Sequence, residues 1–174
     1  EDVPVVAGDT VYVGPGTYRE LLTVDVSGTA GNPITYIGDY LGTFTDGVGG
    51  VVRITGSDND QTATRANAIT ATTKNYRTFR GFHMDTTTST TVNQNGGTDW
   101  IIDQCFVVNS ASCPITVAGS GQLRTTISNC VLFGGGGANG IIFTHTSVVD
   151  NTAHEVNNCL IQSVNTGIRD DRIG

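Results

Sequence analysis

The stretch WIIDQCFVV at Trp100–Val108 recurs in altered form twice further along the chain and decides the fold. It returns as TTISNCVLF at Thr125–Phe133 and as HEVNNCLIQ at His154–Gln162, with the cysteine in the same place each time. An earlier segment, RTFRGFHMD at Arg77–Asp85, fits the alignment with Phe82 in the cysteine column. Successive copies are 23, 25 and 29 residues apart. A period of this length, built from short strand-like pieces, is typical of a solenoid in which each repeat packs on its neighbours.

Three apolar columns run through these copies in phase with the cysteines. An apolar residue lies three positions before the cysteine, another two positions after it, and a third about ten positions after it. The columns consist of Phe79, Ile102, Ile127 and Val156; of Met84, Val107, Leu132 and Ile161; and of Ile69, Val92, Ile115, Ile141 and Ile168. Each turn of a parallel β-solenoid rises by one inter-strand spacing, roughly 4.8 Å, so equivalent side chains stack directly in the core. We therefore predict an all-β fold, a single-stranded parallel β-helix of about six or seven coils, in which Ile127 and Leu132 are fully buried.

Two other architectures fit the pattern less well. A leucine-rich repeat has a similar period but needs a leucine-rich consensus that these segments do not show. A β-sandwich spaces its strands differently and would not keep the columns in phase. No segment places apolar residues at helical spacing.

The first coils begin in GDTVYVGPGTYRE at Gly8–Glu20. An alternating strand at 10–13 is followed by a corner at Gly14-Pro15-Gly16, and the chain continues around from residue 18 to 26. The segment GTAGNPITYIGDY at Gly28–Tyr40 provides a second corner and the next strand. The chain turns so soon after its first strand because it is coiling.

This opening resembles the first coils of right-handed parallel β-helix proteins in the pectate-lyase-like superfamily. It is most similar to the chondroitinase B and alginate lyase branch, where a GDT-strand-GTY segment is followed by GT…NPIT. Similar openings occur in phage and bacterial surface β-helix proteins. The resemblance implies a right-handed coil, and it allows several functions, because the superfamily includes lyases, hydrolases and non-catalytic fibre proteins.

Composition limits the class of partner. The 174 residues suit one domain, 1–174, and their net charge of −7 with only 14% charged residues argues against nucleic acid. No apolar run of about 18 residues is present to span a membrane, and no signal peptide is visible. No amphipathic helix precedes the first coil to cap it, and the pattern stops in mid-coil at Gly174. We therefore expect the domain to be part of a longer chain or a larger assembly.

The cysteines predict a ladder of buried, reduced thiols rather than a metal site. Cys105, Cys130 and Cys159 occupy one column, and Cys113 lies outside it before Pro114. Zinc sites need paired cysteines or clustered histidines at short spacing, which are absent here. We expect no metal and no cofactor.

Two groups of charged residues are candidates for catalysis. A cluster of Lys74, Arg77 and Arg80 provides the basic groups that hold an acidic sugar in a lyase, although the same residues also suit a solvated outer face. The pair Asp170 and Asp171 is similar to the adjacent aspartates of pectinase-like hydrolases, and glycoside cleavage needs two nearby carboxylates. The accompanying motifs of that family are missing, and a solvated end segment explains this pair equally well.

One predicted face of the solenoid is unusually apolar. The residues between the two inward columns point outward, namely His83, Phe106, Val131 and Leu160, and they are followed two positions on by Val108 and Phe133. The alternative interpretation is a register shift at a bend. An exposed apolar stripe marks an interface. We expect Phe106, Val108, Val131, Phe133 and Leu160 to be covered by another protein chain.

Together these patterns favour a non-catalytic structural or glycan-contacting module of an extracellular or virion assembly. The alternative is a fragment of a polysaccharide lyase or glycoside hydrolase that acts on acidic polysaccharide. Expected partners are other copies or other chains of the assembly, and polysaccharide. Neither nucleic acid nor a membrane is expected as a partner.

Overall fold

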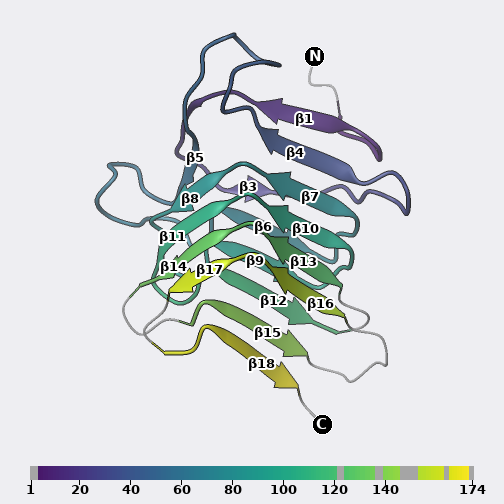
Figure 1. Cartoon of the computed structure of the whole chain (residues 1–174), viewed down its shortest axis with the longest axis vertical. Helices are drawn as coiled ribbons and strands as arrows, with labels where there is room; N and C mark the ends of the chain where they lie inside the picture. The colour runs from purple at the N-terminus through teal and green to yellow at the C-terminus, as the bar shows by residue number, and fades with distance from the viewer. Residues whose placement is uncertain (1–3, 121–123, 136–138, 146–152, 163–164, 173–174) are drawn as a thin grey trace.

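The computed structural model describes residues 4–120, 124–135, 139–145, 153–162 and 165–172, and within them it contains no helix. The chain forms a parallel β-solenoid of six turns with three six-stranded sheets (Figure 1). Sheet A consists of β1 (Thr10–Val13), β4 (Ile34–Gly38), β7 (Arg77–Arg80), β10 (Trp100–Asp103), β13 (Thr125–Ser128) and β16 (His154–Asn157). Sheet B consists of β2 (Gly16–Tyr18), β5 (Val52–Thr55), β8 (His83–Asp85), β11 (Phe106–Ser110), β14 (Val131–Gly134) and β17 (Leu160–Gln162). Sheet C consists of β3 (Leu22–Thr23), β6 (Ile69–Thr72), β9 (Val92–Asn95), β12 (Ile115–Gly119), β15 (Ile141–His145) and β18 (Ile168–Arg172).

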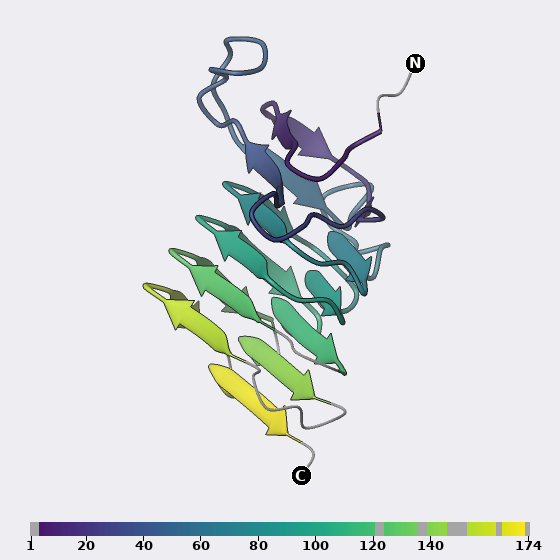
Figure 2. The ribbon, with the colours of Figure 1, turned by 90° about the vertical axis from the view of Figure 1, so that its right-hand side faces the viewer.

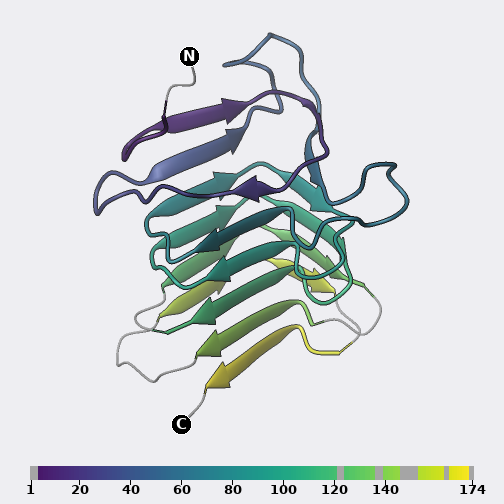
Figure 3. The ribbon, with the colours of Figure 1, turned by 180° about the vertical axis from the view of Figure 1, so that it is seen from behind.

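The coil is right-handed. The chain runs along sheets A and B on one side and returns along sheet C on the other, and it descends by one strand per turn (Figures 1 and 3). Seen from the N-terminal end, it turns clockwise as it recedes, which is the usual hand for parallel strands joined by crossovers. The strands stack in successive layers, and the loop between β4 and β5 projects from the N-terminal end (Figure 2).

The strand register confirms all three predicted columns. Ile102 lies opposite Phe79 and Ile127, Val107 lies opposite Met84 and Leu132, and Ile115 lies opposite Val92 and Ile141. The last coil continues each column, with Val156, Ile161 and Ile168. Ile127 and Leu132 are completely buried, as predicted. The opening also follows the expected path, because β1 pairs in parallel with β4 of the next coil.

The corner between sheets A and B depends on residues that accept a left-handed backbone. The residue before the cysteine column has a positive φ in four coils, 76° at Gly81, 53° at Gln104 and Asn129, and 50° at Asn158. Glycine and asparagine tolerate this conformation better than other residues. The asparagine side chains also link the coils, since Asn158 Nδ2 donates a hydrogen bond of 2.7 Å to Asn129 Oδ1. The chain therefore changes direction within about two residues in each of these turns.

The stacked thiols of Cys105, Cys130 and Cys159 lie at the same corner between sheets A and B. All four cysteines are free; Cys105 and Cys130 are buried, and Cys159 is half-buried because β17 has a neighbouring strand on one side only. Each thiol of the ladder donates to a carbonyl of the preceding coil, for example Cys130 Sγ to the Ile102 oxygen at 3.5 Å. Burial raises the pKa of Cys159, which keeps that thiol protonated at neutral pH.

Candidate functional site

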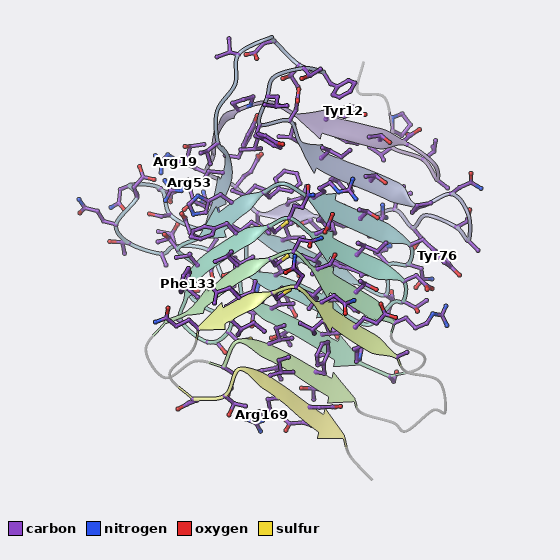
Figure 4. The ribbon with its side chains drawn as sticks, viewed as in Figure 1. Tyr12, Arg19, Arg53, Tyr76, Phe133 and Arg169 are labelled. Atoms are coloured by element: carbon purple, nitrogen blue, oxygen red, sulfur yellow. The ribbon has the colours of Figure 1, made fainter. Side chains whose placement is uncertain are left out.

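The outer face of sheet B combines an apolar half with a charged half. The register places Arg53 beside His83, His83 beside Phe106, Phe106 beside Val131, and Val131 beside Leu160. The outward residues that the sequence pattern assigned to one face therefore do share it, and the column continues upward to Arg53. Arg19, Arg53 and Phe133 lie on this side of the solenoid (Figure 4).

The apolar half consists of stacked side chains of several coils. Phe106 packs edge-on against His83, with ring centroids 4.9 Å apart, and against Phe133 at 5.8 Å. Phe106 is 37% exposed and Leu160 is 59% exposed, while Val108, Val131 and Phe133 are half-buried. Large apolar groups thus reach the surface in neighbouring strands of this face. Such an exposed stripe can bind a partner chain or the apolar face of a ligand.

A hollow of about 530 Å³ lies where this face meets the corner with sheet A, and it is called the corner hollow below. It is lined by Tyr40, Gly50, Val51, Val52, Gly81, Phe82, His83, Gln104 and Phe106. One wall comes from β8 and β11, and the other comes from the loop between β4 and β5. The volume falls within the range typical of small-molecule sites.

The loop that forms the second wall is held by a buried carboxylate. Asp39 accepts hydrogen bonds from the backbone N–H groups of Thr43 and Phe44, at 3.0 and 2.6 Å, and from the Thr45 hydroxyl at 3.1 Å. The Phe44 ring stacks on Tyr12 with centroids 4.3 Å apart. These contacts fix the loop against the first coil, and Tyr40 keeps more than half of its surface exposed at the edge of the hollow.

Beside the hollow, five charged or ionisable side chains form a network, called the charged network below. Its members are Arg19, Arg53, Asp60, Asp85 and His83. Arg53 donates from Nε and Nη2 to the two oxygens of Asp85, at 2.7 and 2.9 Å, and from Nη1 to Asp60 Oδ1 at 2.6 Å. Such a two-point pairing of guanidinium and carboxylate fixes both groups in one plane. The two arginines and two aspartates balance, so the network has no net charge when His83 is neutral.

The network also determines the protonation of its members. Hydrogen bonds from Arg19, followed by those from Arg53, lower the pKa of Asp60 to about 2. Burial by itself would raise the pKa of Asp85, but hydrogen bonds from Arg53, Thr55 and Thr86 and the positive charge of Arg53 together outweigh it, so the pKa is lowered. Burial lowers the pKa of His83, and the nearby Asp85 offsets this only in part. His83 is therefore neutral at pH 7, and the aspartates are ionised.

The structure does not bring the three basic candidates together. Lys74 lies in the connection between β6 and β7, where its carbonyl accepts a hydrogen bond of 2.7 Å from Trp100 Nε1. Arg80 is on the outer face of sheet A, with Nε 2.9 Å from Asp103 Oδ2. Arg77 is completely buried, which corrects the expectation of an outer position for it. Residues two apart in a strand share a face, so Arg77 points inward with Phe79.

The two acidic candidates also fail to form a pair. Asp170 and Asp171 are adjacent in β18, and adjacent residues of a strand point to opposite faces. Arg169 Nε donates to Asp171 Oδ1 at 2.8 Å, so this carboxylate is part of a surface ion pair. The geometry that acid–base glycoside cleavage needs, with two carboxylates facing one bond, is not provided by these two residues.

Sequence reasoning missed most of the charged network. Arg19, Arg53 and Asp60 belong to the first coils, before the regular cysteine repeats begin, and Asp60 lies in the connection between β5 and β6. The alternation in VVRIT, residues 51–55, was the available signal, because it places Arg53 on the face opposite Val52 and Ile54. Nothing in the spacing indicated which carboxylates would face it.

A smaller groove of about 300 Å³ crosses the outer face of sheet A. Its lining includes Tyr76, Ile101 and Glu155, and the ion pair of Arg124 Nη2 with Asp99 Oδ2 at 2.6 Å. Tyr76 lies on the side of the solenoid opposite Arg53 in Figure 4. This groove is separate from the corner hollow, with which it shares no lining residue.

Within the described ranges, no three His, Cys, Asp or Glu side chains are grouped as metal ligands would be. The same residues include no helix with the length and apolar character needed to cross a membrane.

Comparison with known proteins supports the fold. No family model matches the chain, and no curated protein matches it in sequence. Among solved structures, a rhamnogalacturonan lyase is similar, with a TM-score of 0.53 and 14% sequence identity. The match covers 98% of this chain and 56% of the lyase, so the chain spans about half the length of that protein. At this identity the similarity establishes a shared parallel β-helix fold.

Proposed function

We propose that this chain is a non-catalytic, glycan-contacting β-helix module of a larger extracellular or virion assembly, and that it holds polysaccharide in the corner hollow. The observation that carries the proposal is the position of exposed aromatic side chains next to a fixed Arg–Asp network at one hollow of about 530 Å³. The groove on sheet A also contains an ion pair, between Arg124 and Asp99, but fewer aromatic side chains line it than line the corner hollow.

The two halves of the site suit the two kinds of surface on a sugar. A pyranose ring presents an apolar face of C–H groups, which packs on flat aromatic side chains such as Tyr40 and Phe106. Its hydroxyls lie at the ring edge, where His83 and Gln104 offer hydrogen-bonding groups within the hollow. Because each network charge is already paired, the site favours hydroxyl groups over additional carboxylates. The net charge of −7 also disfavours a strongly acidic polymer.

A glycan-array screen first identifies oligosaccharides that the protein binds. Isothermal titration calorimetry then measures their affinity for the wild type and for variants. Phe106→Ala should weaken binding by roughly 2- to 12-fold, which corresponds to the loss of one aromatic contact. Ile101→Ala is the matched control, because Ile101 is 39% exposed, close to the 37% of Phe106, but lies on sheet A. Equal affinity of the two variants, or no glycan binding by the wild type, would refute the proposal.

A second candidate function is a polysaccharide lyase. The resemblance of the opening to chondroitinase B and alginate lyase suggests the same activity. Two observations favour it, the fold shared with a rhamnogalacturonan lyase and the neutral imidazole of His83 at the hollow. In such a reaction a base removes the C5 proton of a uronate, the C4–O bond breaks, and a C4–C5 double bond forms while the leaving oxygen is protonated. A neutral histidine is chemically suited to the first step.

Absorbance of unsaturated uronates separates the two functions. The protein is incubated with rhamnogalacturonan, pectate, alginate and chondroitin, and His83→Ala is compared with the wild type. Product formation by the wild type that is lost in the variant would replace the binding-module proposal with the lyase. Glycan binding without product would support the module.

Assembly is the remaining part of the proposal. Below the corner hollow, Val131 and Leu160 continue the apolar stripe along sheet B without lining the hollow. We propose that a second protein chain packs there, which would leave the hollow open to glycan. The parallel, straight-sided coil suits side-by-side packing in a symmetric fibre or docking on a shell.

A further inference from the structure

The loop at the N-terminal end of the solenoid exposes a group of large apolar side chains. It joins β4 to β5 and rises beyond the first coil (Figure 2). Leu41, Phe44 and Val48 in this loop are 64%, 66% and 62% exposed, which exceeds the exposure of every other large apolar side chain in the described ranges. The Phe44 ring also stacks on Tyr12, which is 38% exposed. These four side chains are called the apolar knob below.

The loop is fixed by its own backbone, so the knob has a defined shape without a partner. The Gly42 N–H donates to the Asp39 carbonyl at 2.8 Å, and the Gly47 N–H donates to the Gly42 carbonyl at 2.9 Å. Gly42 has a φ of 71°, and a Cβ on it would lie 2.5 Å from the Val48 carbonyl oxygen. Only glycine suits this close crossing of two parts of the loop. An ordered knob loses little conformational entropy when it binds.

The same end of the solenoid has an apolar depression of about 140 Å³, called the end pocket below. It is lined by Val11, Val13, Tyr18, Glu20, Leu22, Tyr36, Ile54 and Phe82. Most of this wall belongs to the first coil, whose strands β1, β2 and β3 have a neighbouring strand on one side only. A cavity of roughly 150 Å³ accommodates one benzene-sized group, so the pocket has room for a Leu or Phe side chain. No residue of the knob is part of its lining, so the loop leaves the pocket of its own chain uncovered.

We propose that two copies of this chain pair end to end about a two-fold axis, and that the knob of each copy covers the end pocket of the other. A convex and a concave apolar surface at one end are self-complementary, and a two-fold contact covers both at once and closes the assembly. The pair also shields the unpaired edges of the first coil. Tyr40 and Val51, near the two ends of the same loop, line the corner hollow, which the pair leaves open.

The area of these surfaces suits a second copy. Four large apolar side chains with exposed fractions of 38–66% provide about 400 Å² on each knob. A symmetric pair buries two knobs and the two surfaces that they cover, about 1,600 Å² in total, which is the usual size of a specific interface.

The charges indicate that the contact is apolar. The loop has no Lys or Arg between residues 39 and 51, and Glu20, the one charged residue of the pocket lining, is exposed. Each copy has a net charge of −7, so electrostatic repulsion opposes the pair. Salt should therefore strengthen the association by screening this repulsion.

The first experiment measures association by sedimentation velocity in the Val131→Asp/Leu160→Asp variant, whose stripe on sheet B no longer associates and whose folding is checked by circular dichroism. This variant should form dimers, with a Kd that falls as NaCl rises from about 0.05 to 0.5 M. Adding Leu41→Asp should raise the dimer Kd by about 100-fold or more, because the symmetric contact loses two buried leucine side chains.

The matched control is Ile101→Asp in the same background, because Ile101 is exposed on sheet A, away from the N-terminal end. It should leave the dimer Kd unchanged. A background variant that stays monomeric, a dimer that weakens with salt, or equal Kd values for Leu41→Asp and Ile101→Asp would overturn the proposal.

The second experiment locates the contact in the otherwise wild-type chain. Leu41→p-benzoylphenylalanine places a photoreactive group on the knob, and this variant is mixed with wild-type copies labelled with heavy nitrogen and irradiated. Mass spectrometry should find links from position 41 to end-pocket residues of the labelled copy, such as Val11 or Leu22. Links only within one copy, links only to residues outside the end pocket, or no links would overturn the proposal.

Discussion

Replacing Leu132 with alanine tests the stacked core most directly. The side chain has no exposed surface and lies between Val107 and Ile161 of the two neighbouring coils. Leucine-to-alanine changes in protein cores cost about 2–5 kcal/mol, and the cost is greatest where the surroundings cannot close the cavity. Here the parallel backbone ladders hold the coils about 4.8 Å apart, so the cavity stays open. We therefore expect a loss of about 3–5 kcal/mol, or roughly 6–20 °C in Tm for a chain of this length.

The matched control is Leu160→Ala, the same substitution in the adjacent strand β17. Leu160 is 59% exposed, so its truncation should change stability by less than about 0.5 kcal/mol in the monomer. Urea unfolding followed by circular dichroism gives the midpoint and the slope for both variants at low protein concentration. Equal midpoint shifts for the two variants, or a Leu132→Ala shift below about 1 kcal/mol, would show that the column does not form the core.

Three further predictions concern assembly, thiols and acid stability. Val131→Asp with Leu160→Asp should give a folded protein that no longer associates side by side, because charges replace the part of the apolar stripe below the corner hollow; analytical ultracentrifugation measures this. Denaturing alkylation without reductant should modify all four cysteines, which mass spectrometry counts. Acidification should lower Tm, because the pKa values of Asp60 and Asp85 are lower in the folded chain than in the unfolded one. Their contribution is present above about pH 4 and is lost as the pH falls toward about 2. Asp85→Asn should flatten this dependence.

The outcomes that would contradict these predictions are distinct. A wild type that stays monomeric at high concentration would remove the assembly proposal without affecting the hollow. Fewer than four alkylated cysteines would indicate a disulfide within the column or to Cys113. A Tm that is constant between about pH 5 and 2, or an equal acid response in Asp85→Asn and wild type, would show that the charged network does not stabilise the fold.

The repetitive part of this protein follows from the sequence alone. Side chains alternate between the two faces of a strand, and successive coils are stacked in register. One alignment of cysteines therefore separates the inward from the outward columns in the described strands between Arg77 and Ile168. The same rule identified the stripe of Phe106, Val131 and Leu160, and it also implied that Arg77, two residues before Phe79, points inward. The expected cluster of Lys74, Arg77 and Arg80 did not form, because it was based on closeness in sequence and not on which face of the strand each side chain occupies.

Only the tertiary structure decided what lies beside that stripe. Arg53 and His83 are 30 residues apart, and the connections before and after β5 are irregular, so no period in the sequence joins them. The Asp60 carboxylate reaches Arg19 and Arg53 through a loop whose path depends on contacts rather than on repetition. Core positions repeat because the strand ladder repeats, whereas a site depends on where the non-repeating loops and side chains meet.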